Sequence, residues 1–537
     1  MSDPSDKGGV LQAAAEHRLA GRLREAENLY RQVLRDDPNE SEAIHGLGLL
    51  ALQMRKTELA AAYLAQAAGL SPRVAVYHRD HGDAWLQIGE FNLAAGCYQR
   101  ALALEPAAPE SHAALGIALE RLQRFSDAIQ SLQKSIDLGL NRPDIYQHLG
   151  NALLQLDRYA ESESAARKAV ERAPGSAESW QTLGEALGNQ QRPDEAMECF
   201  RKAISLKPEL PIPHYALGIT LGRVGRMEEA IACLRRAVRL RPEFPEALTQ
   251  LGTMLVGRRE LDPAIQTLRE AARLRPSHLD THVELARAFE IAQRPQDAAE
   301  MFEKILKLSP NNQNVKFHLA ALSGKDAPSI APAGLVTTLF DRHAQTFDHH
   351  LTEQLQYRVP QLLRDALTEA GVGDCLDVLD LGCGTGLCGM LLRPIAQTLT
   401  GLDLSKGMVE MARQRGIYDR LEVVEIVAGL RAKPEAYDLL VAGDVFCYFG
   451  NLSEVVAAAA FALRPGGLFA FSVEESESPE WVLRASRRYA HHPSYVRGVA
   501  SQFGFEVIQL ETRGLRKEAG KDLAGLVAVL RRSSTPE

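Results

Sequence analysis

Prolines recur along much of the chain at one spacing, and this recurrence constrains the fold more than any other feature of the sequence. Each gap between them is 34 residues, or twice 34 where Leu140 stands in place of a proline. The series consists of Pro38, Pro72, Pro106, Pro174, Pro208, Pro242, Pro276 and Pro310. A period of this length indicates a stack of similar small units, and not a set of unrelated globular domains.

Small residues keep the same period in two further columns. Each glycine of the first column stands 24 residues before a repeat-ending position, and the column consists of Gly48, Gly82, Gly116, Gly150, Gly184, Gly218 and Gly252. The second column consists of Ala60, Ala94, Ala128, Ala196, Ala230, Ala264 and Ala298. Both are explained by two antiparallel helices that pack so closely that only Gly or Ala fits at their crossing, with proline ending the second helix. The first part of the chain is therefore predicted to be an α solenoid.

These columns resemble the tetratricopeptide repeat (TPR). The resemblance extends to a column of large apolar partners, Tyr30, Leu64, Tyr98, Leu132, Phe200, Leu234, Leu268 and Phe302. It implies a TPR superhelix over residues 7–322, with about nine repeats and a closing helix at 312–322. The pattern departs from the family at Ala14, which replaces the small glycine, at Leu140, which replaces proline, and at Ser162, where alanine is usual. Atypical terminal units are common in solenoids because they cap the stack.

The composition changes at residues 323–334, which are rich in Pro, Gly and Ala and are predicted to be a linker. Beyond it the period of 34 is absent, and short apolar runs alternate with helical stretches. The expected strands are residues 377–381, 398–402, 422–424, 439–442, 468–473, 506–510 and 523–530. Strands that alternate with helices predict an α/β domain over residues 335–537 with a doubly wound, Rossmann-like parallel sheet, in which the two late strands close one edge.

One strand of this domain runs directly into a glycine-rich turn. The apolar run 378–381 is followed by Gly382, Gly384 and Gly386 and then by a predicted helix. Glycines let the backbone approach a ligand, and a helix N-terminus offers amide donors. The next strand ends in Asp403, whose carboxylate can accept both hydrogen bonds of a ribose diol. The pattern predicts a ribose-bearing cofactor at the carboxyl edge of the sheet.

Residues 384–389 also match the dinucleotide pattern G-x-G-x-x-G, which is weak evidence alone. In a dinucleotide fingerprint the first glycine directly follows the strand, but here Gly382 holds that place and Asp380 lies two residues before it. With Asp403 and the turn at 463–468, the arrangement resembles the class I S-adenosylmethionine-dependent methyltransferase fold. An oxidoreductase and a purely structural glycine turn are the alternatives.

This resemblance covers about residues 335–532 and implies roles for particular residues. Asp380 would lie near the cofactor's amino group, Asp403 would hold the ribose hydroxyls, and Leu404 would pack on the adenine. Glu425 would replace the acid that family members often carry beside the adenine amine. The residues implied to bind S-adenosyl-L-methionine are Asp380, Gly382, Cys383, Gly384, Gly386, Asp403, Leu404, Glu425 and Ile426.

Three further runs, 340–351, 471–475 and 488–491, resemble a bacterial group of predicted TPR-containing methyltransferases. This narrower resemblance supplies no substrate. In related enzymes the segment before the first strand is a lid over cofactor and acceptor, which would place His343, Phe347 and Tyr357 above the site.

Methyl transfer needs a base only if the acceptor atom carries a proton. The favoured candidate bases are Asp444, His343, His349 and His491, and the further candidates are His350, Tyr489 and His492. Each could equally be a solvated or structural side chain. The Asn-Pro-rich tetrapeptide typical of many base and amide N-methyltransferases is absent after the fourth strand, at residues 444–447. We therefore expect transfer to oxygen or nitrogen, with nucleic-acid bases and glutamine amides disfavoured.

The solenoid adds a groove that is expected to bind an extended peptide or a partner protein. The first-helix positions expected to face it are mostly acidic: Glu42, Asp83, Glu110, Glu120, Asp144, Glu178, Glu185, Glu246, Asp280 and Glu290, against Arg79 and Arg287. An acidic groove favours a basic or neutral partner, unless these are merely solvated faces. Two functions follow: a methyltransferase whose repeats recruit its substrate or partner complex, or an interaction scaffold with a decayed catalytic domain.

Charge and cysteine usage exclude several classes of protein. A net charge of -8 argues against a nucleic-acid partner bound by phosphate neutralisation. Seven cysteines without a C-x-x-C pair predict no zinc site, no other metal site and a reducing, cytoplasmic location. Residues 1–7 lack the apolar run of a signal peptide, and the apolar stretch 455–463 is nine residues long, so we expect neither export nor a membrane partner.

Overall fold

The computed structural model describes residues 7–518 and 521–534. The expectation about the extreme N-terminus therefore falls largely outside the described residues, as do the last three residues of the predicted 335–537 domain. The chain divides into two compact units between Leu274 and Arg275. The boundaries predicted from composition, 7–322, 323–334 and 335–537, stay predictions. Among the described residues, no helix is both long and apolar enough to span a membrane.

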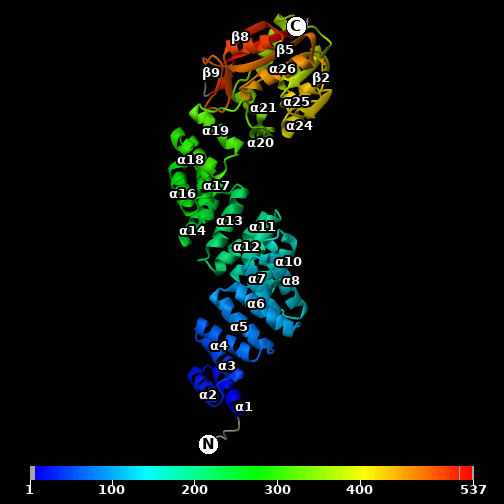
Figure 1. Cartoon of the computed structure of the whole chain (residues 1–537). Coiled ribbons are helices and arrows are strands. Elements are labelled where there is room, and N and C mark those ends of the chain that lie inside the picture. Colours follow the sequence, from blue (N-terminus) through cyan, green and yellow to red (C-terminus); the bar gives the residue numbers. More distant parts are fainter. Residues whose placement is uncertain (1–6, 519–520, 535–537) are drawn as a thin grey trace. The chain divides into compact units, whose positions relative to one another are not determined.

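The first unit is built from helices in antiparallel pairs (Figure 1). The helices are α1 (Lys7–Leu19), α2 (Leu23–Asp36), α3 (Ser41–Gln53), α4 (Thr57–Leu70), α5 (Ala75–Ile88), α6 (Phe91–Leu104), α7 (Pro109–Arg121), α8 (Phe125–Asp137), α9 (Pro143–Leu154), α10 (Tyr159–Arg172), α11 (Ala177–Asn189), α12 (Pro193–Leu206), α13 (Pro211–Arg223), α14 (Met227–Leu240), α15 (Pro245–Gly257) and α16 (Leu261–Leu274). The repeat prolines stand directly after the second helices; Pro38, for example, lies two residues beyond the end of α2. The solenoid predicted from the spacing is confirmed.

The glycine column works as the sequence predicts. A Cβ on Gly252 of α15 would lie 2.4 Å from Cγ of Leu268 in α16. A Cβ on Gly82 would likewise lie 2.6 Å from the ring carbon Cε1 of Tyr98. Where alanine is replaced by Ser162, its hydroxyl donates a hydrogen bond to the Gly150 carbonyl at 2.8 Å, so the polar group is satisfied inside the helix pair.

The second unit begins with three more helices, α17 (Leu279–Ile291), α18 (Pro295–Leu308) and α19 (Gln313–Ser323). The last of these is the predicted closing helix. This helix packs against the α/β region: Phe317 is 1% exposed and packs with Leu483 and Tyr489 there. The segment predicted as a linker is also anchored there, since the Tyr489 hydroxyl donates to the Pro328 carbonyl at 2.5 Å and Ala331 donates its amide to Tyr448.

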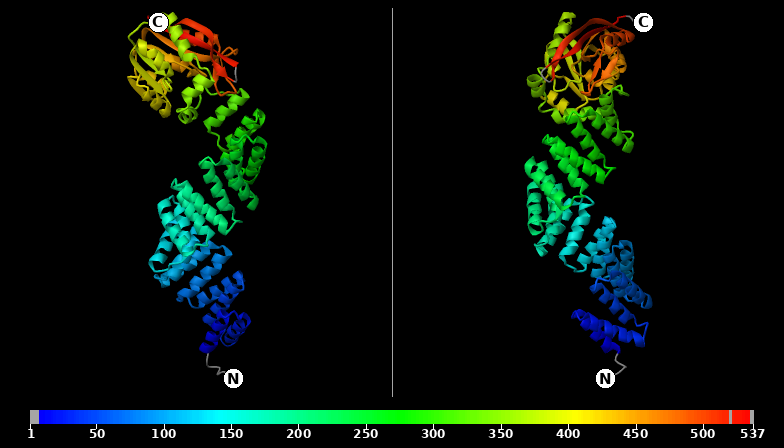
Figure 2. Two further views of the ribbon diagram at one scale, coloured as in Figure 1. Left: turned by 180° about the vertical axis from the view of Figure 1, so that it is seen from behind. Right: turned by 90° about the vertical axis from the view of Figure 1, so that its left-hand side faces the viewer.

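Among its described residues, the α/β region contains one mixed sheet of nine strands. Figure 2 shows the ribbon from two further sides. The strands are β1 (Leu376–Leu381), β2 (Ala396–Asp403), β3 (Arg420–Val423), β4 (Tyr437–Ala442), β5 (Leu463–Glu475), β6 (Trp481–Leu483), β7 (Tyr489–His491), β8 (Phe505–Glu518) and β9 (Lys521–Arg532). The path runs β3-β2-β1-β4-β5-β7-β6, and β9 pairs antiparallel with β5 and β8. All seven expected strands are present, and the short hairpin β6–β7 is an addition that sequence periodicity did not reveal.

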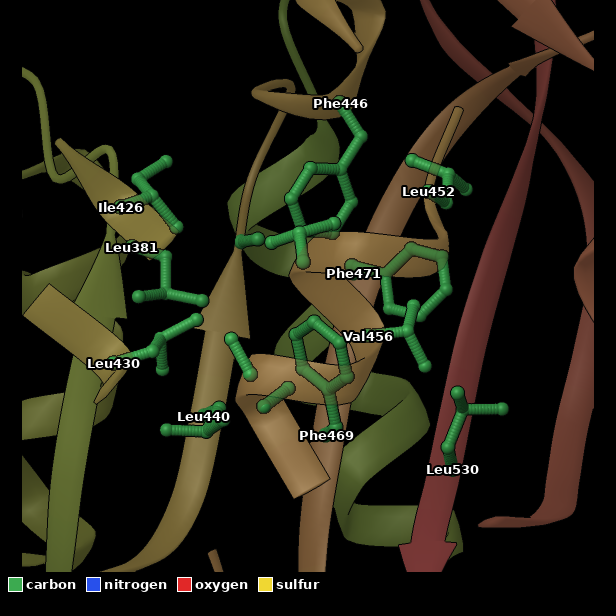
Figure 3. Packing of buried hydrophobic residues seen from close by; sticks show 14 of the residues in the cluster. Leu381, Ile426, Leu430, Leu440, Phe446, Leu452, Val456, Phe469, Phe471 and Leu530 are labelled. Atoms are coloured by element: carbon green, nitrogen blue, oxygen red, sulfur yellow. The ribbon is translucent and has the colours of Figure 1, made fainter. Parts of the chain in front are cut away.

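Helices cover both faces of the sheet. They are α20 (Ala333–His343), α21 (Phe347–His349), the π-helix η1 (His350–Gln354), α22 (Val359–Glu369), α23 (Leu387–Leu392), η2 (Arg393–Ile395), α24 (Lys406–Gln414), α25 (Ile426–Arg431), η3 (Phe446–Tyr448), α26 (Ser453–Ala462) and α27 (Pro493–Gln502). Alternate residues of β4 enter different cores: Leu440 packs with α25 and α26, whereas Leu439 packs with α22 and α23. Figure 3 shows the first core, in which Phe446, Phe469 and Phe471 gather above the sheet. The predicted doubly wound α/β architecture is confirmed.

Candidate active site

A cavity of about 690 Å³ opens at the carboxyl ends of β1, β2 and β4. This size falls within the range of about 300–1,000 Å³ typical of small-molecule sites. Its floor is formed by the turns after these strands, and its roof by α20, α21 and η1. Because β1 lies between β2 and β4, the turn after β2 and the turn after β4 stand on opposite sides of the glycine turn. Ligands of α/β sheets bind in such a crevice.

The glycine turn adopts a conformation that ordinary residues avoid. The φ angles of Gly382, Gly384 and Gly386 are +62°, +54° and +95°. A Cβ on Gly382 would also lie 2.5 Å from a methyl carbon of Val445. Gly382, Cys383 and Gly384 line the cavity, but Gly386 does not. Gly382 and Gly384 therefore present backbone without a side chain to a ligand, whereas Gly386 supplies the positive φ that the turn needs.

Asp403 ends β2 and lines the cavity. Its Oδ2 accepts a hydrogen bond from the Gly384 amide at 2.9 Å, and its Oδ1 accepts one from the Ser405 amide at 2.8 Å. Burial raises its pKa above the ordinary value. Each carboxylate oxygen has a second lone pair, so the fixed side chain can accept two further hydrogen bonds from a diol. Leu404, beside it, also lines the cavity.

Asp380 does not line the cavity. It is 1% exposed, its Oδ2 accepts a hydrogen bond from the Tyr418 hydroxyl at 2.7 Å, and burial raises its pKa to about 7. Its buried Oδ1 has no hydrogen-bond partner. The carboxyl group lies below the cavity surface. Its unpartnered oxygen is compatible with the predicted amino group of a ligand, with a water molecule between them.

Glu425 and Ile426 line the cavity on the side of β3. The Glu425 carboxylate accepts hydrogen bonds from the amides of Val427 at 3.0 Å and Ala428 at 2.9 Å, which caps the N-terminus of α25. Glu425, which is predicted to meet an adenine amine, therefore also caps a helix. It retains free lone pairs, because each oxygen accepts one of these hydrogen bonds.

Two carboxylates that the sequence reasoning did not single out attach the roof to the segments that follow β1 and β2. Asp341 in α20 accepts hydrogen bonds from the Ser405 hydroxyl at 2.5 Å and from the Gly407 amide at 3.0 Å. The hydrogen bond with Ser405 is the main reason that the pKa of Asp341 lies below its ordinary value. Asp348 accepts hydrogen bonds from Thr385 and Arg415. The predicted lid therefore lies over the glycine turn and is attached at both of its helices.

Asp444 lines the cavity beyond β4, as predicted, but its carboxylate is not free. Arg516 Nη1 donates to both of its oxygens at 2.9 Å, and Arg488 Nη2 donates to Oδ2 at 2.9 Å. Its backbone φ is +57°, which is strained for a residue with a side chain. Both carboxylate oxygens are engaged by guanidinium groups, so Asp444 is better suited to hold Arg488 in place.

The structure places the histidines His343, His349 and His491 in different surroundings. His343 and His349 line the cavity from the roof, and His349 is paired with Glu353 at 3.2 Å. His491 is 0% exposed and does not line the cavity. Its Nε2 bonds to the Gly450 carbonyl at 3.0 Å, and its ring stacks on Tyr495. The expectation that His491 faces the acceptor is therefore wrong, because the β6–β7 hairpin directs this side chain into the protein interior.

Sequence reasoning also did not single out Arg488, which lines the cavity, or Arg516 and Glu474, which form ion pairs beside it. Arg488 and Glu474 stand in runs noted for a family resemblance, but Arg516 stands in β8 with no local pattern around it. They meet only through sheet pairing and the hairpin, so no spacing in the sequence relates them. Among the described residues, no group of three metal-ligating side chains is assembled.

Family models match both parts of the chain. The methyltransferase domain model matches residues 379–471. The tetratricopeptide repeat model matches residues 11–75 and 79–142, and the model of the C-terminal domain of cilia and flagella-associated protein 70 matches residues 141–322.

Curated relatives are similar to the methyltransferase region. Malonyl-[acyl-carrier protein] O-methyltransferase of Halalkalibacterium halodurans is 34% identical over 146 residues, which is 25% of this chain and 52% of that protein. Ubiquinone biosynthesis O-methyltransferase of Thiobacillus denitrificans is 26% identical over 180 residues, or 29% and 78% of the two chains. The chain spans about half the length of the first of these. Among solved structures, the TPR protein YrrB, described as having an unusual peptide-binding site, matches 34% of this chain and 95% of its own, with 22% identity and a TM-score of 0.31.

Repeats, fold and site together define a two-part protein. The chain joins tetratricopeptide repeats to a class I methyltransferase domain, so the resemblance noted in the sequence is confirmed in both parts. Homologous methyltransferases imply S-adenosylmethionine as the methyl donor. The narrower resemblance to a bacterial group stays a prediction.

Proposed function

We propose that the chain is an active S-adenosylmethionine-dependent methyltransferase that methylates an oxygen or nitrogen atom, and that its repeats recruit a protein substrate or partner. The observation on which this rests is Asp403, held by the amides of Gly384 and Ser405 beside a glycine turn in left-handed conformation. A decayed domain would be expected to lose such constrained glycines and the buried acid. The intact geometry therefore favours an enzyme over a scaffold.

The residues fit the cofactor. The glycine turn leaves no room for a Cβ at Gly382, and Asp380, whose Oδ1 has no partner but lies below the cavity surface, would meet the donor amino group through water. Asp403 would hold the ribose, and Leu404, Glu425 and Ile426 would surround the adenine. When bound, S-adenosylmethionine supplies an activated methyl group. The chain's own residues then have to orient the acceptor and keep water away, which the lid attached through Asp341 and Asp348 favours.

A base is required only for an acceptor that carries a proton, and His343, His349 and His350 are the candidate histidines that line the cavity. The names of the curated relatives, which are O-methyltransferases, support oxygen as the accepting atom. Single-turnover rates of His343→Ala, His349→Ala and His350→Ala over a range of pH, with the true acceptor, test this role. Removal of the responsible base should lower the chemical rate by about 10²–10⁴. Unchanged rates and pH profiles in all three variants would mean that alignment alone suffices.

The repeats are proposed to bind a basic or neutral protein segment along an acidic face, in a reducing, cytoplasmic compartment where the seven cysteines stay unpaired. The experiment that tests the whole proposal adds methyl-labelled S-adenosylmethionine to a cell lysate with the wild-type chain, with Asp403→Ala, or with no added protein. Label that enters protein or a small molecule only with the wild type supports the enzyme. Equal labelling with the wild type and Asp403→Ala would contradict it.

A further inference from the structure

A cluster of charged side chains lies beside the cavity, and its members come from separate strands and turns. Asp444 follows β4, Glu474 stands in β5, and Arg516 stands in β8. Arg488 immediately precedes β7, and Arg484 immediately follows β6. The hairpin that sequence periodicity did not reveal thus brings two guanidinium groups to the end of β4.

The cluster contains more positive than negative charge. Arg516 Nη2 lies 2.8 Å from Glu474 Oε1, Arg484 Nη1 lies 3.1 Å from Glu474 Oε2, and Arg488 Nε lies 2.7 Å from Glu474 Oε1. Arg488 and Arg516 also share the carboxylate of Asp444. Three guanidinium groups therefore face two carboxylates, and Glu474 and Arg516 are only 1% and 4% exposed. Unbalanced charge with so little access to water favours binding of an anion.

Arg488 presents this unbalanced charge to the cavity. Among the described residues that line the cavity, it is the one Arg or Lys. Its Nη2 donates to Asp444 and to Cys447, and its Nε lies against Glu474, but its Nη1 forms no hydrogen bond within the described part of the chain. The ring of Tyr448 lies 5.5 Å from the guanidinium carbon, which keeps the group in one orientation.

We propose that Arg488 binds a carboxylate group of the methyl acceptor. This assignment rests on the proposed methyltransferase function and specifies the chemistry of its acceptor. One negative charge matches the one surplus positive charge, and the Nη1 donors, which have no acceptor among the described residues, can hydrogen-bond a carboxylate. A phosphate monoester, with about -1.5 to -2 charges, would overbalance the cluster. Because folding has already removed Arg488 from most of the solvent, binding an acid pairs a charge that a neutral acceptor would leave unpaired.

Ligand-observed NMR of the full chain tests the assignment with matched probes. The probes are hexanoate and benzoate, their primary amides, and inorganic phosphate, each in the presence and absence of S-adenosylhomocysteine. We expect both acids to bind at least about ten times more tightly than their amides, and phosphate to bind no better than the amides. Arg488→Met should lose the preference for acids and still bind S-adenosylhomocysteine. Arg487→Met is the matched control, because Arg487 pairs with Glu290, outside the cluster, and does not line the cavity, and this variant should keep the preference.

The outcomes separate this inference from the proposed function. Equal binding of acids and amides by the wild type would overturn the inference without any variant, and so would tighter binding of phosphate than of either acid. Retained acid preference in an Arg488→Met protein that binds S-adenosylhomocysteine would overturn it as well. If Arg488→Met does not fold, Arg488→Lys replaces it: this variant keeps the charge but not the guanidinium geometry that places Nη1, and should weaken both acids at least about threefold. If the wild type prefers acids but never binds S-adenosylhomocysteine, the acid site stands and the methyltransferase proposal fails.

Discussion

The ring of Phe317 in α19 lies 6.1 Å, centroid to centroid, from the ring of Tyr489 in β7. Both side chains are buried, and both belong to one cluster that also contains Leu483 and Ala331. In the turn between β6 and β7, a side-chain nitrogen of Arg487 lies 3.8 Å from a carboxylate oxygen of Glu290 in α17. The closing helix of the repeats is therefore part of the hydrophobic core that supports the hairpin, and the hairpin positions Arg488.

This relationship predicts where the chain can be cut. A fragment of residues 275–537 should fold and bind S-adenosylhomocysteine like the full chain, because it keeps α17 to α19. A fragment of residues 323–537 should be less stable by at least about 3 kcal/mol, since it exposes the partners of Phe317. Chemical denaturation and calorimetric titration of the two fragments measure the difference. In the full chain, Phe317→Ala should be strongly destabilising and Lys316→Ala, at an exposed position, nearly neutral. Equal stability of the two fragments would contradict the prediction.

The glycine columns make a second prediction about the repeats. Gly252→Ala should destabilise the first unit by about 1–3 kcal/mol, because the new Cβ would lie 2.4 Å from Leu268 Cγ inside a packed helix pair. Gly96→Ala is the matched control: Gly96 is also within a helix, but nothing lies within 4 Å of its Cβ position. This control should stabilise by about 0.5–1 kcal/mol through helix propensity. Thermal unfolding of both variants decides whether the column reflects close packing.

The repeats and the sheet could be predicted from the sequence because their signals are local and periodic. Pro38 and Gly82 repeat in register with equivalent positions, and the run 378–381 is recognisable as a strand before a glycine turn. The acceptor side of the site has no such signal. Arg516 reaches Asp444 across 72 residues of sequence through strand pairing, and the direction of His491 depends on a three-residue strand. These contacts are products of tertiary structure, so spacing alone could not reveal them.

Burial of His491 predicts how stability depends on pH. Desolvation lowers its pKa from 6.5 to about 4, so the folded state keeps the ring neutral while the unfolded state protonates below pH 6.5. The stability contributed by His491 is therefore present above pH 6.5 and is lost as the pH falls towards about 4, by about 3 kcal/mol in total. His491→Gln should lose less stability than the wild type over this range. The exposed His343→Gln should behave like the wild type.

Denaturant titrations at several pH values between about 4 and 8 measure this difference. Asp380 acts in the opposite direction, because burial raises its pKa to about 7 and its contribution to stability is lost as the pH rises towards that value. The comparison must therefore be made between variant and wild type at each pH, where the contribution of Asp380 is common to both. Parallel curves for His491→Gln and the wild type would show that the ring is not kept neutral by burial.

Asp403 gives the most direct prediction for cofactor binding. Its fixed oxygens can each accept one hydrogen bond beyond those from Gly384 and Ser405, so Asp403→Ala should remove charge-assisted hydrogen bonds worth about 1.5–3 kcal/mol. Calorimetric titration should then show affinity for S-adenosylmethionine weakened about ten- to a hundredfold. Glu410→Gln is the control, because Glu410 stands on the exposed face of α24 and pairs only with Arg413 among the described residues. Its affinity should match the wild type. Unchanged binding in Asp403→Ala would contradict the ribose assignment, and tighter binding of NAD than of S-adenosylmethionine by the wild type would restore the dinucleotide interpretation of the glycine turn.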